Sequence, residues 1–95
     1  MVGRARNSRP RRSRATRTRA AHQRSLEALA ARLRQLRDER GLSQKSAATL
    51  IGVGPPVVRR MEAAVGNPSL AVLLSVARAF DIPIGYLFGK RGKRE

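Results

Sequence analysis

Two adjacent arginines, Arg59 and Arg60, are the residues of this chain that point most directly to a chemical role. They lie between Val58 and Met61, which are three residues apart and therefore share one face of a helix. We expect that apolar face to be buried and the two guanidinium groups to point outward. Guanidinium groups bind phosphate and the edges of bases, so nucleic acid is the ligand class that the two arginines suggest.

The stretch that carries these arginines, residues 44–62, is expected to form two short helices joined by a tight turn. Ser43 can cap the first helix, and Gly52 can end it, because a left-handed backbone is easy for glycine. The second helix begins with Pro55 and Pro56, which are tolerated in a first turn because its N–H groups have no helical partner.

Three residues set how these two helices cross. Ala48 is small enough for a close approach, Gly52 lies at the bend, and Val58 can fill the gap between the crossed helices. A helix-turn-helix requires this combination at this spacing. From the residues alone, a plain αα-hairpin inside a bundle stays open as the alternative.

Three further helices complete an expected all-α fold of five helices without strands. One runs from the Ser25 cap to about residue 40, one over about residues 70–80, and a short last one from Pro83 to Gly89. Their apolar positions are Leu26, Leu29, Ala30, Leu33 and Leu36 in the first, Leu70, Leu73, Leu74, Ala77 and Phe80 in the second, and Ile84, Leu87 and Phe88 in the last.

Positive charge is concentrated at the ends of the chain, whose 95 residues carry a net charge of +15. Residues 1–24 contain nine Arg, no acidic residue and almost nothing to bury, so we expect a disordered arm that follows phosphates. A solvated tail, a start codon assigned too far upstream and a cleaved transit-like peptide are the alternatives. The chain thus divides into an arm over 1–24, a helix-turn-helix domain over 25–89 and a basic tail over 90–95.

Several classes of site are not expected. The chain has no cysteine and a single histidine, His22, so neither a disulfide nor a zinc site can be built. No catalytic constellation is visible, and we expect neither an enzyme nor a cofactor or small-molecule substrate. No apolar run is long enough for a membrane span, so a cytoplasmic, nucleoid-associated protein is expected.

Residues 26–88 resemble the lambda-repressor-like DNA-binding domain of the phage Cro/C1 and Xre type. The resemblance implies a transcriptional regulator that binds specific sequences of double-stranded DNA, usually as a dimer, with the helix at about 55–63 in the major groove. The matching segments are RLRQLRDERGLSQ at 32–44, Ala48, IGV at 51–53, VVRRME at 57–62, NPSL at 67–70 and SVARAFDIP at 75–83.

The resemblance also implies roles for individual residues. Pro55, Pro56 and Arg60 match the base-facing positions of the recognition helix, and Gln44 matches a phosphate contact. Arg37 and Glu62 match an internal ion pair between the first and third helices. The further residues expected to contact phosphate are Lys45, Arg59, Arg9, Arg11, Arg12 and Arg14.

This sequence departs from the family pattern where bases and phosphates are bound. Two prolines stand where polar base readers are usual, and the loop over residues 63–66 is neutral where basic residues are usual. These departures motivate two alternatives: a protein-interaction module with a degenerate helix-turn-helix, and a non-specific nucleic-acid-binding protein driven by the arm.

A weak homodimer is also expected from the last helix. Ile84, Tyr86, Leu87 and Phe88 make that helix apolar for its length, and part of it could form a small contact between two copies. The alternative is that all four side chains cover the core of the monomer.

Overall fold

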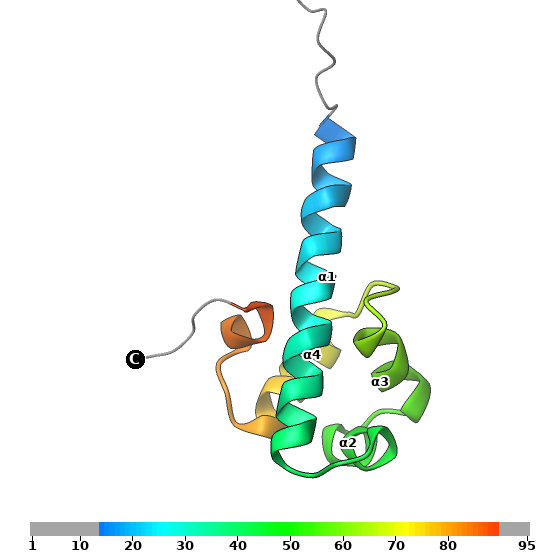
Figure 1. Ribbon diagram of the computed structural model, residues 1–95, viewed down its shortest axis with the longest axis vertical. Coiled ribbons are helices and arrows are strands. Elements are labelled where there is room, and N and C mark those ends of the chain that lie inside the picture. Colours follow the sequence, from blue (N-terminus) through cyan, green and yellow to red (C-terminus); the bar gives the residue numbers. More distant parts are fainter. Residues whose placement is uncertain (1–13, 90–95) are drawn as a thin grey trace, which may run out of the picture.

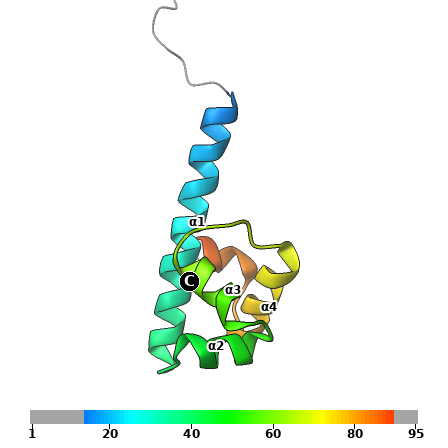
Figure 2. The same ribbon diagram turned by 90° about the vertical axis from the view of Figure 1, so that its right-hand side faces the viewer.

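The computed structural model describes residues 14–89, which form a bundle packed against one long helix (Figure 1). In chain order the elements are α1 (Arg14–Glu39), α2 (Gln44–Ile51), α3 (Pro55–Glu62), α4 (Leu70–Phe80) and the 3₁₀ helix η1 (Ile84–Phe88). The other elements lie on one side of the C-terminal half of α1, whereas its N-terminal half projects beyond them (Figure 2). The described residues contain no strand, in agreement with the all-α prediction.

The prediction of five α-helices was wrong, because residues 14–89 contain four α-helices and a last element that is a 3₁₀ helix. Pro83 immediately precedes η1 in an extended conformation, and Gly89 ends it with a left-handed backbone at φ 84°. Gly85 inside this five-residue segment weakens it further as an α-helix. Only five residues lie between the proline and the left-handed glycine. A segment of this length suits the i→i+3 hydrogen bonds of a 3₁₀ helix, which is usually short.

The expected disordered arm was also wrong for residues 14–24, because α1 begins at Arg14 and not after Ser25. This stretch has no glycine or proline and is rich in alanine and arginine, which are among the best helix formers. Once the packed half of the helix has formed, each added residue gains a hydrogen bond without a new nucleation step. Residues 1–13 of the expected arm, and the expected tail over 90–95, lie outside the described residues.

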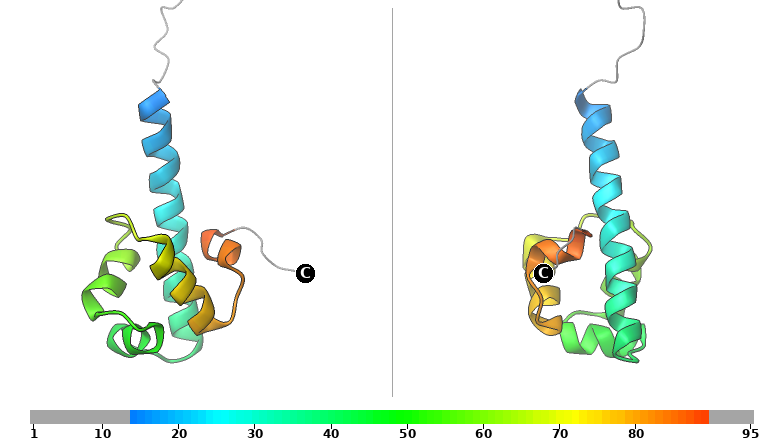
Figure 3. Two further views of the ribbon diagram at one scale, coloured as in Figure 1. Left: turned by 180° about the vertical axis from the view of Figure 1, so that it is seen from behind. Right: turned by 60° about the vertical axis from the view of Figure 1, so that its left-hand side comes forward.

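The core lies between the C-terminal half of α1 and the other four elements. The predicted stripe of α1 is buried throughout, and Leu29 and Leu33 are fully inaccessible to solvent. Helix α4 packs on α2 and η1, and the right-hand view of Figure 3 shows it on the side of the bundle away from α1. The other buried side chains of the main cluster are Leu36, Ala48, Ile51, Val58, Met61, Val76, Ala77, Phe80 and Leu87.

Helix α4 buries part of its predicted apolar face, at Ala77 and Phe80, and leaves another part of it exposed. Leu70 and Leu74 are 65% and 40% exposed, whereas Val76 is fully buried together with Ala77 and Phe80. Most residues of α4 are apolar, so helical spacing alone leaves more than one possible stripe. The packing of α4 on α2 and η1 selects the face that is buried.

Two arginines of α1 and Arg40, which directly follows it, bind backbone oxygens of three other elements. Arg34 Nη1 donates to the backbone oxygen of Glu62 at 2.7 Å, and Arg40 Nη2 donates to that of Phe80 at 3.1 Å. Arg32 Nε donates to the Tyr86 oxygen at 2.9 Å and lies 3.8 Å from the centre of the Tyr86 ring. The last carbonyls of a helix have no partner within it, so these cations stabilise the ends of α3, α4 and η1 on α1.

Within the described part of the chain, no helix is both long enough and apolar enough to span a membrane. The acidic and histidine side chains of that part also form no group of three or more that could hold a metal ion.

Candidate nucleic-acid interface

The α2–α3 turn has the geometry that the spacing of Ala48, Gly52 and Val58 predicts. Gly52 takes a left-handed backbone at φ 95°, and its N–H donates to the Ala48 oxygen at 2.8 Å. The N–H of Val53 donates to the same oxygen at 3.0 Å. Ala48 is 1% exposed and Val58 is fully buried, so the two helices cross tightly at these side chains.

The surface of α3 is sharply divided between buried and exposed positions. Val58, Met61 and Glu62 are buried, whereas Arg59 and Arg60 are exposed. Pro56 is also exposed, and it lies three and four residues before the two arginines, so the three side chains form one outward stripe. Among residues 14–89, neither Arg59 nor Arg60 has a hydrogen-bond acceptor. Both cations are therefore available to an external anion.

The two helix N-termini at the turn differ in the backbone donors that they offer. Pro55 and Pro56 have no N–H, and the N–H of Val57 already donates to the Gly54 oxygen at 3.0 Å. The first turn of α3 thus has no free amide with which to bind a phosphate. In α2, by contrast, the N–H groups of Gln44 and Lys45 have no helical acceptor, because they precede the first intrahelical bond.

Arg37 and Glu62 form a bidentate ion pair between α1 and α3. Arg37 Nε lies 2.7 Å from Glu62 Oε2, and Arg37 Nη2 lies 2.9 Å from Oε1. The remaining amine, Nη1, donates to the Leu42 oxygen at 2.9 Å. The Glu62 side chain is only 4% exposed and that of Arg37 is 18% exposed, so the contact is largely shielded from water.

Gln44 joins this ion pair from α2. Its Nε2 donates to Glu62 Oε1 at 3.0 Å, so the side chain expected to contact phosphate is bound inside the protein. Burial raises the pKa of Glu62, but the hydrogen bonds from Arg37 and Gln44 oppose it, and the net pKa lies below its usual value. The hydrogen bond to Glu62 in turn raises the pKa of Arg37. Both groups are therefore charged at neutral pH.

A family model described as helix-turn-helix, HTH_3, matches residues 33–87, which is more than half of the chain. The chain belongs to the Cro/C1-type helix-turn-helix family. This is a family of DNA-binding transcription regulators.

Two solved structures are similar to this Cro/C1-type chain. The restriction-modification controller protein C.AhdI from Aeromonas hydrophila is 40% identical over 66% of this chain and 96% of its own, with a TM-score of 0.62. An HTH_3 family transcriptional regulator from Vibrio cholerae is 27% identical with a TM-score of 0.65, over 70% of this chain. The match spans only 38% of the length of the Vibrio protein. None of the curated proteins compared with the chain matches it.

In this Cro/C1-type domain the projecting half of α1 carries basic side chains next to the loop that follows α3. Figure 2 shows the α3–α4 loop beside the middle of α1, where Gln23 Nε2 donates to the Ala64 oxygen at 3.4 Å. Arg14, Arg19 and Arg24 are exposed on the free half of the helix. Arg9, Arg11 and Arg12, the other arm residues expected to contact phosphate, lie outside the described residues.

The residues expected to form a dimer contact mostly cover the core. Leu87 is fully buried, and Ile84, Tyr86 and Phe88 are partly buried against the main cluster. A second apolar surface that the sequence did not single out is formed by Leu70 and Leu74 on α4. Their i and i+4 positions are visible in the sequence, but their exposure depends on how α4 packs.

Proposed function

We propose that the chain is a sequence-specific DNA-binding transcriptional regulator that inserts α3 into the major groove. The observation that carries this proposal is the outward stripe of α3, where Pro56, Arg59 and Arg60 stand opposite a fully buried face. Arg32 and Arg34 of α1 and the following Arg40 are committed to internal acceptors, whereas the two arginines of α3 have none among the described residues. A helix with this division fits a groove lined by acceptors and phosphates.

Different residues are assigned to bases and to phosphates. Arg60 is the proposed base reader, with the two acceptors of a guanine edge as its target, and Pro55 and Pro56 are proposed to contact thymine methyl groups. Arg59 and Lys45 are proposed to contact phosphate. Because the Gln44 side chain is bound to Glu62, the backbone N–H of Gln44 is the better candidate for its phosphate contact.

The two structural neighbours support a regulatory function, since one is described as a controller protein and the other as a transcriptional regulator. We also propose that the chain binds DNA without catalysing a reaction. It is proposed to form a weak homodimer and to be associated with the nucleoid. The exposed arginines of α1 are proposed to add phosphate contacts outside the groove that α3 occupies.

Selection of bound sequences from a random DNA pool tests the proposal directly. The full chain and a variant without residues 1–24 would be selected in parallel. A specific regulator should enrich one site and bind it about a thousandfold or more tightly than random DNA. Near-equal affinity for all sequences would indicate non-specific compaction, and loss of all DNA binding without the arm would indicate a protein-interaction module.

Thymine methyl contacts can be tested on the selected site. Replacing each thymine in turn by uracil removes one methyl group and leaves every hydrogen-bonding atom in place. At the base pair next to Pro55 or Pro56 this change should weaken binding, and in a Pro56→Ala variant the same change should have less effect. If no thymine position responds to the loss of its methyl group, the two prolines do not read bases.

A further inference from the structure

The guanidinium group of Arg60 occupies the space that a side chain at Gly66 would need. A Cβ built on Gly66 would lie 2.8 Å from Arg60 Nη2, 3.3 Å from Nε and 3.4 Å from Cζ. The first of these distances is one that real Cβ atoms essentially never show. The Arg60 side chain therefore leaves α3 toward the α3–α4 loop and lies against the bare backbone of one glycine.

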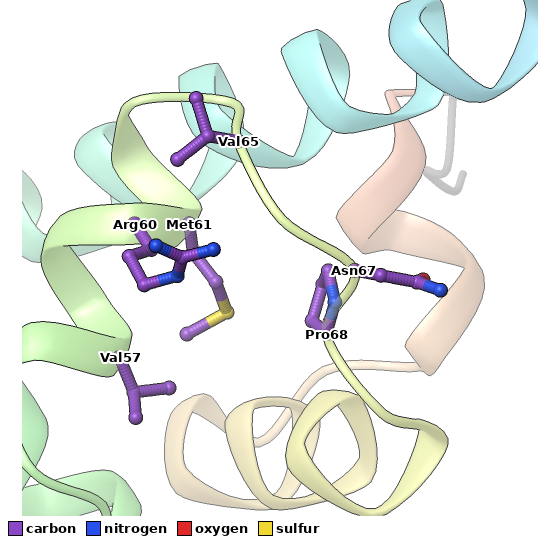
Figure 4. A pocket seen from close by; sticks show the side chains of 6 residues that line it. All are labelled: Val57, Arg60, Met61, Val65, Asn67 and Pro68. Atoms are coloured by element: carbon purple, nitrogen blue, oxygen red, sulfur yellow. The ribbon is translucent and has the colours of Figure 1, made fainter. Parts of the chain in front are cut away.

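A pocket between α3 and this loop frames the Arg60 side chain (Figure 4). The pocket holds about 190 Å³, and Figure 4 shows the Arg60 side chain beside Met61 at α3, on the side of the pocket that faces Asn67 and Pro68. Its lining residues are Val57, Arg60, Met61, Val65, Asn67 and Pro68. Apart from Arg60 the lining is neutral, so no carboxylate in the pocket holds the guanidinium in place.

Hydrogen bonds fix the loop relative to Arg60 itself. The N–H of Val65 donates to the backbone oxygen of Arg60 at 3.1 Å, and the N–H of Ala64 donates to that of Met61 at 3.2 Å. These two bonds form a Schellman motif, with Ala64 in the left-handed conformation at φ 59°. Gly66 follows directly at φ 86°, so its position depends on a motif that is anchored on Arg60.

We infer that Gly66 is a positioning residue for Arg60. The α3–α4 loop, and not α3 alone, sets the direction from which the Arg60 guanidinium meets DNA. This inference rests on the proposed function of Arg60 as a base reader. It adds a determinant of specificity that lies outside the recognition helix and has no side chain of its own. It also gives the neutral loop over residues 63–66 a role that needs no basic residue.

The substitution Gly66→Ala tests the inference, because the new methyl group must displace the guanidinium. Alanine is also strained at a positive φ, and this effect needs its own control. Gly41→Ala supplies it, since Gly41 has φ +64° and a Cβ there would meet nothing within 4 Å. Both variants should melt at a lower temperature than the wild type. Only Gly66→Ala should shift the Nε–Hε resonance of Arg60 in the NMR spectrum of the DNA-free protein.

DNA binding supplies the second measurement, on the site selected from the random pool. Gly66→Ala should change the preference at the base pair read by Arg60 by about tenfold, within the range for one bidentate contact. Gly41→Ala should leave that preference unchanged. In an Arg60→Ala background, Gly66→Ala should have no further effect on base preference.

An unchanged Nε–Hε resonance in Gly66→Ala would overturn the inference, as would a preference change that persists without Arg60. If Arg60→Ala alone alters no base preference, the proposed base reading fails, whereas the resonance still tests the contact with Gly66. If Gly66→Ala does not fold, Gly66→Asn tests the same point, because asparagine tolerates a left-handed backbone and carries the same Cβ.

Discussion

The carboxylate of Glu62 receives two parallel hydrogen bonds from Arg37, at 2.7 and 2.9 Å, although the two residues lie 25 positions apart in the chain. Arg37 lies on α1 and Glu62 is the last residue of α3. Paired planar groups leave little freedom of rotation, so this contact fixes the angle at which α3 leaves the core. The stripe with Arg59 and Arg60 therefore depends on a contact made by a buried side chain at the end of the same helix.

Replacing Glu62 with glutamine should lower stability and DNA affinity together. The change leaves the Arg37 charge without its partner, and we expect a loss of about 3 kcal/mol because the Arg37 side chain keeps some exposure. Calorimetry and binding to the selected site measure the two effects. Glu27→Gln is the control, since Glu27 is exposed and, among residues 14–89, its carboxylate accepts a hydrogen bond only from Gln23, four residues earlier. Unchanged melting with equal or tighter DNA binding would contradict a structural role for the ion pair.

The same carboxylate should make stability depend on acid pH. The pKa of Glu62 is lowered in the folded state, so the unfolded chain binds its proton first as the pH falls below about 4.3. The ion pair therefore contributes fully to the free energy of unfolding above this pH. This contribution is lost as the pH falls through the pKa of Glu62 in the folded protein. The difference in Tm between wild type and Glu62→Gln should shrink between pH 5 and pH 2, while Arg37 stays charged. A constant difference over this range would exclude the linkage.

The two arginines of α3 should differ in what they contribute to binding. Arg60→Ala should cost about 1–3 kcal/mol on the selected site and relax the preference at one base pair. Arg59→Ala should weaken selected and random DNA to the same extent, because a phosphate contact carries no sequence information. Titrations of both variants against both DNAs distinguish the roles. Equal weakening of both DNAs by Arg60→Ala would show that Arg60 reads no base.

Removing residues 1–24 should reduce the salt dependence of DNA binding. The segment carries nine Arg, and each phosphate contact contributes about −0.9 to the log–log salt slope. We expect the slope to flatten by several units. The melting temperature should change little, because the first buried side chain of α1 is Leu26. Replacing the nine Arg with Gln keeps the length and helix propensity, so an unchanged slope in that variant would make the arm irrelevant to affinity.

The chain should form a weak dimer that DNA strengthens. Ile84, Tyr86 and Phe88 of η1 keep part of their surface exposed while Leu87 is buried in the core. Sedimentation with and without a symmetric DNA site measures the association. Ile84→Ser should weaken the dimer, whereas Leu70→Ser, on the exposed face of α4, should not. A monomer under both conditions would exclude the dimer, and an effect of Leu70→Ser would move the contact to α4.

Sequence alone determined the elements whose signals are local. Ser43 and Ser69 accept hydrogen bonds from the N–H groups of Ser46 and Val72, as N-caps should, and α2 and α4 begin directly after them. Gly52 ends α2, and the leucine stripe of α1 is buried as its spacing predicts. Capping and helical periodicity act over three or four residues, so the sequence carries this information without reference to the fold.

Only the tertiary structure decided the partners of the charged side chains and the limits of two elements. Arg34, Arg37 and Arg40 are alike in residue type and lie within seven positions, yet their partners differ. Arg34 and Arg37 bind the backbone and the carboxylate of Glu62 at the end of α3, and Arg40 binds the last residue of α4. Nothing local marks where α1 must start, since residues 14–25 are all compatible with a helix. Contacts between residues tens of positions apart depend on how rigid helices pack, and that geometry comes from the whole core and not from any single stretch of sequence.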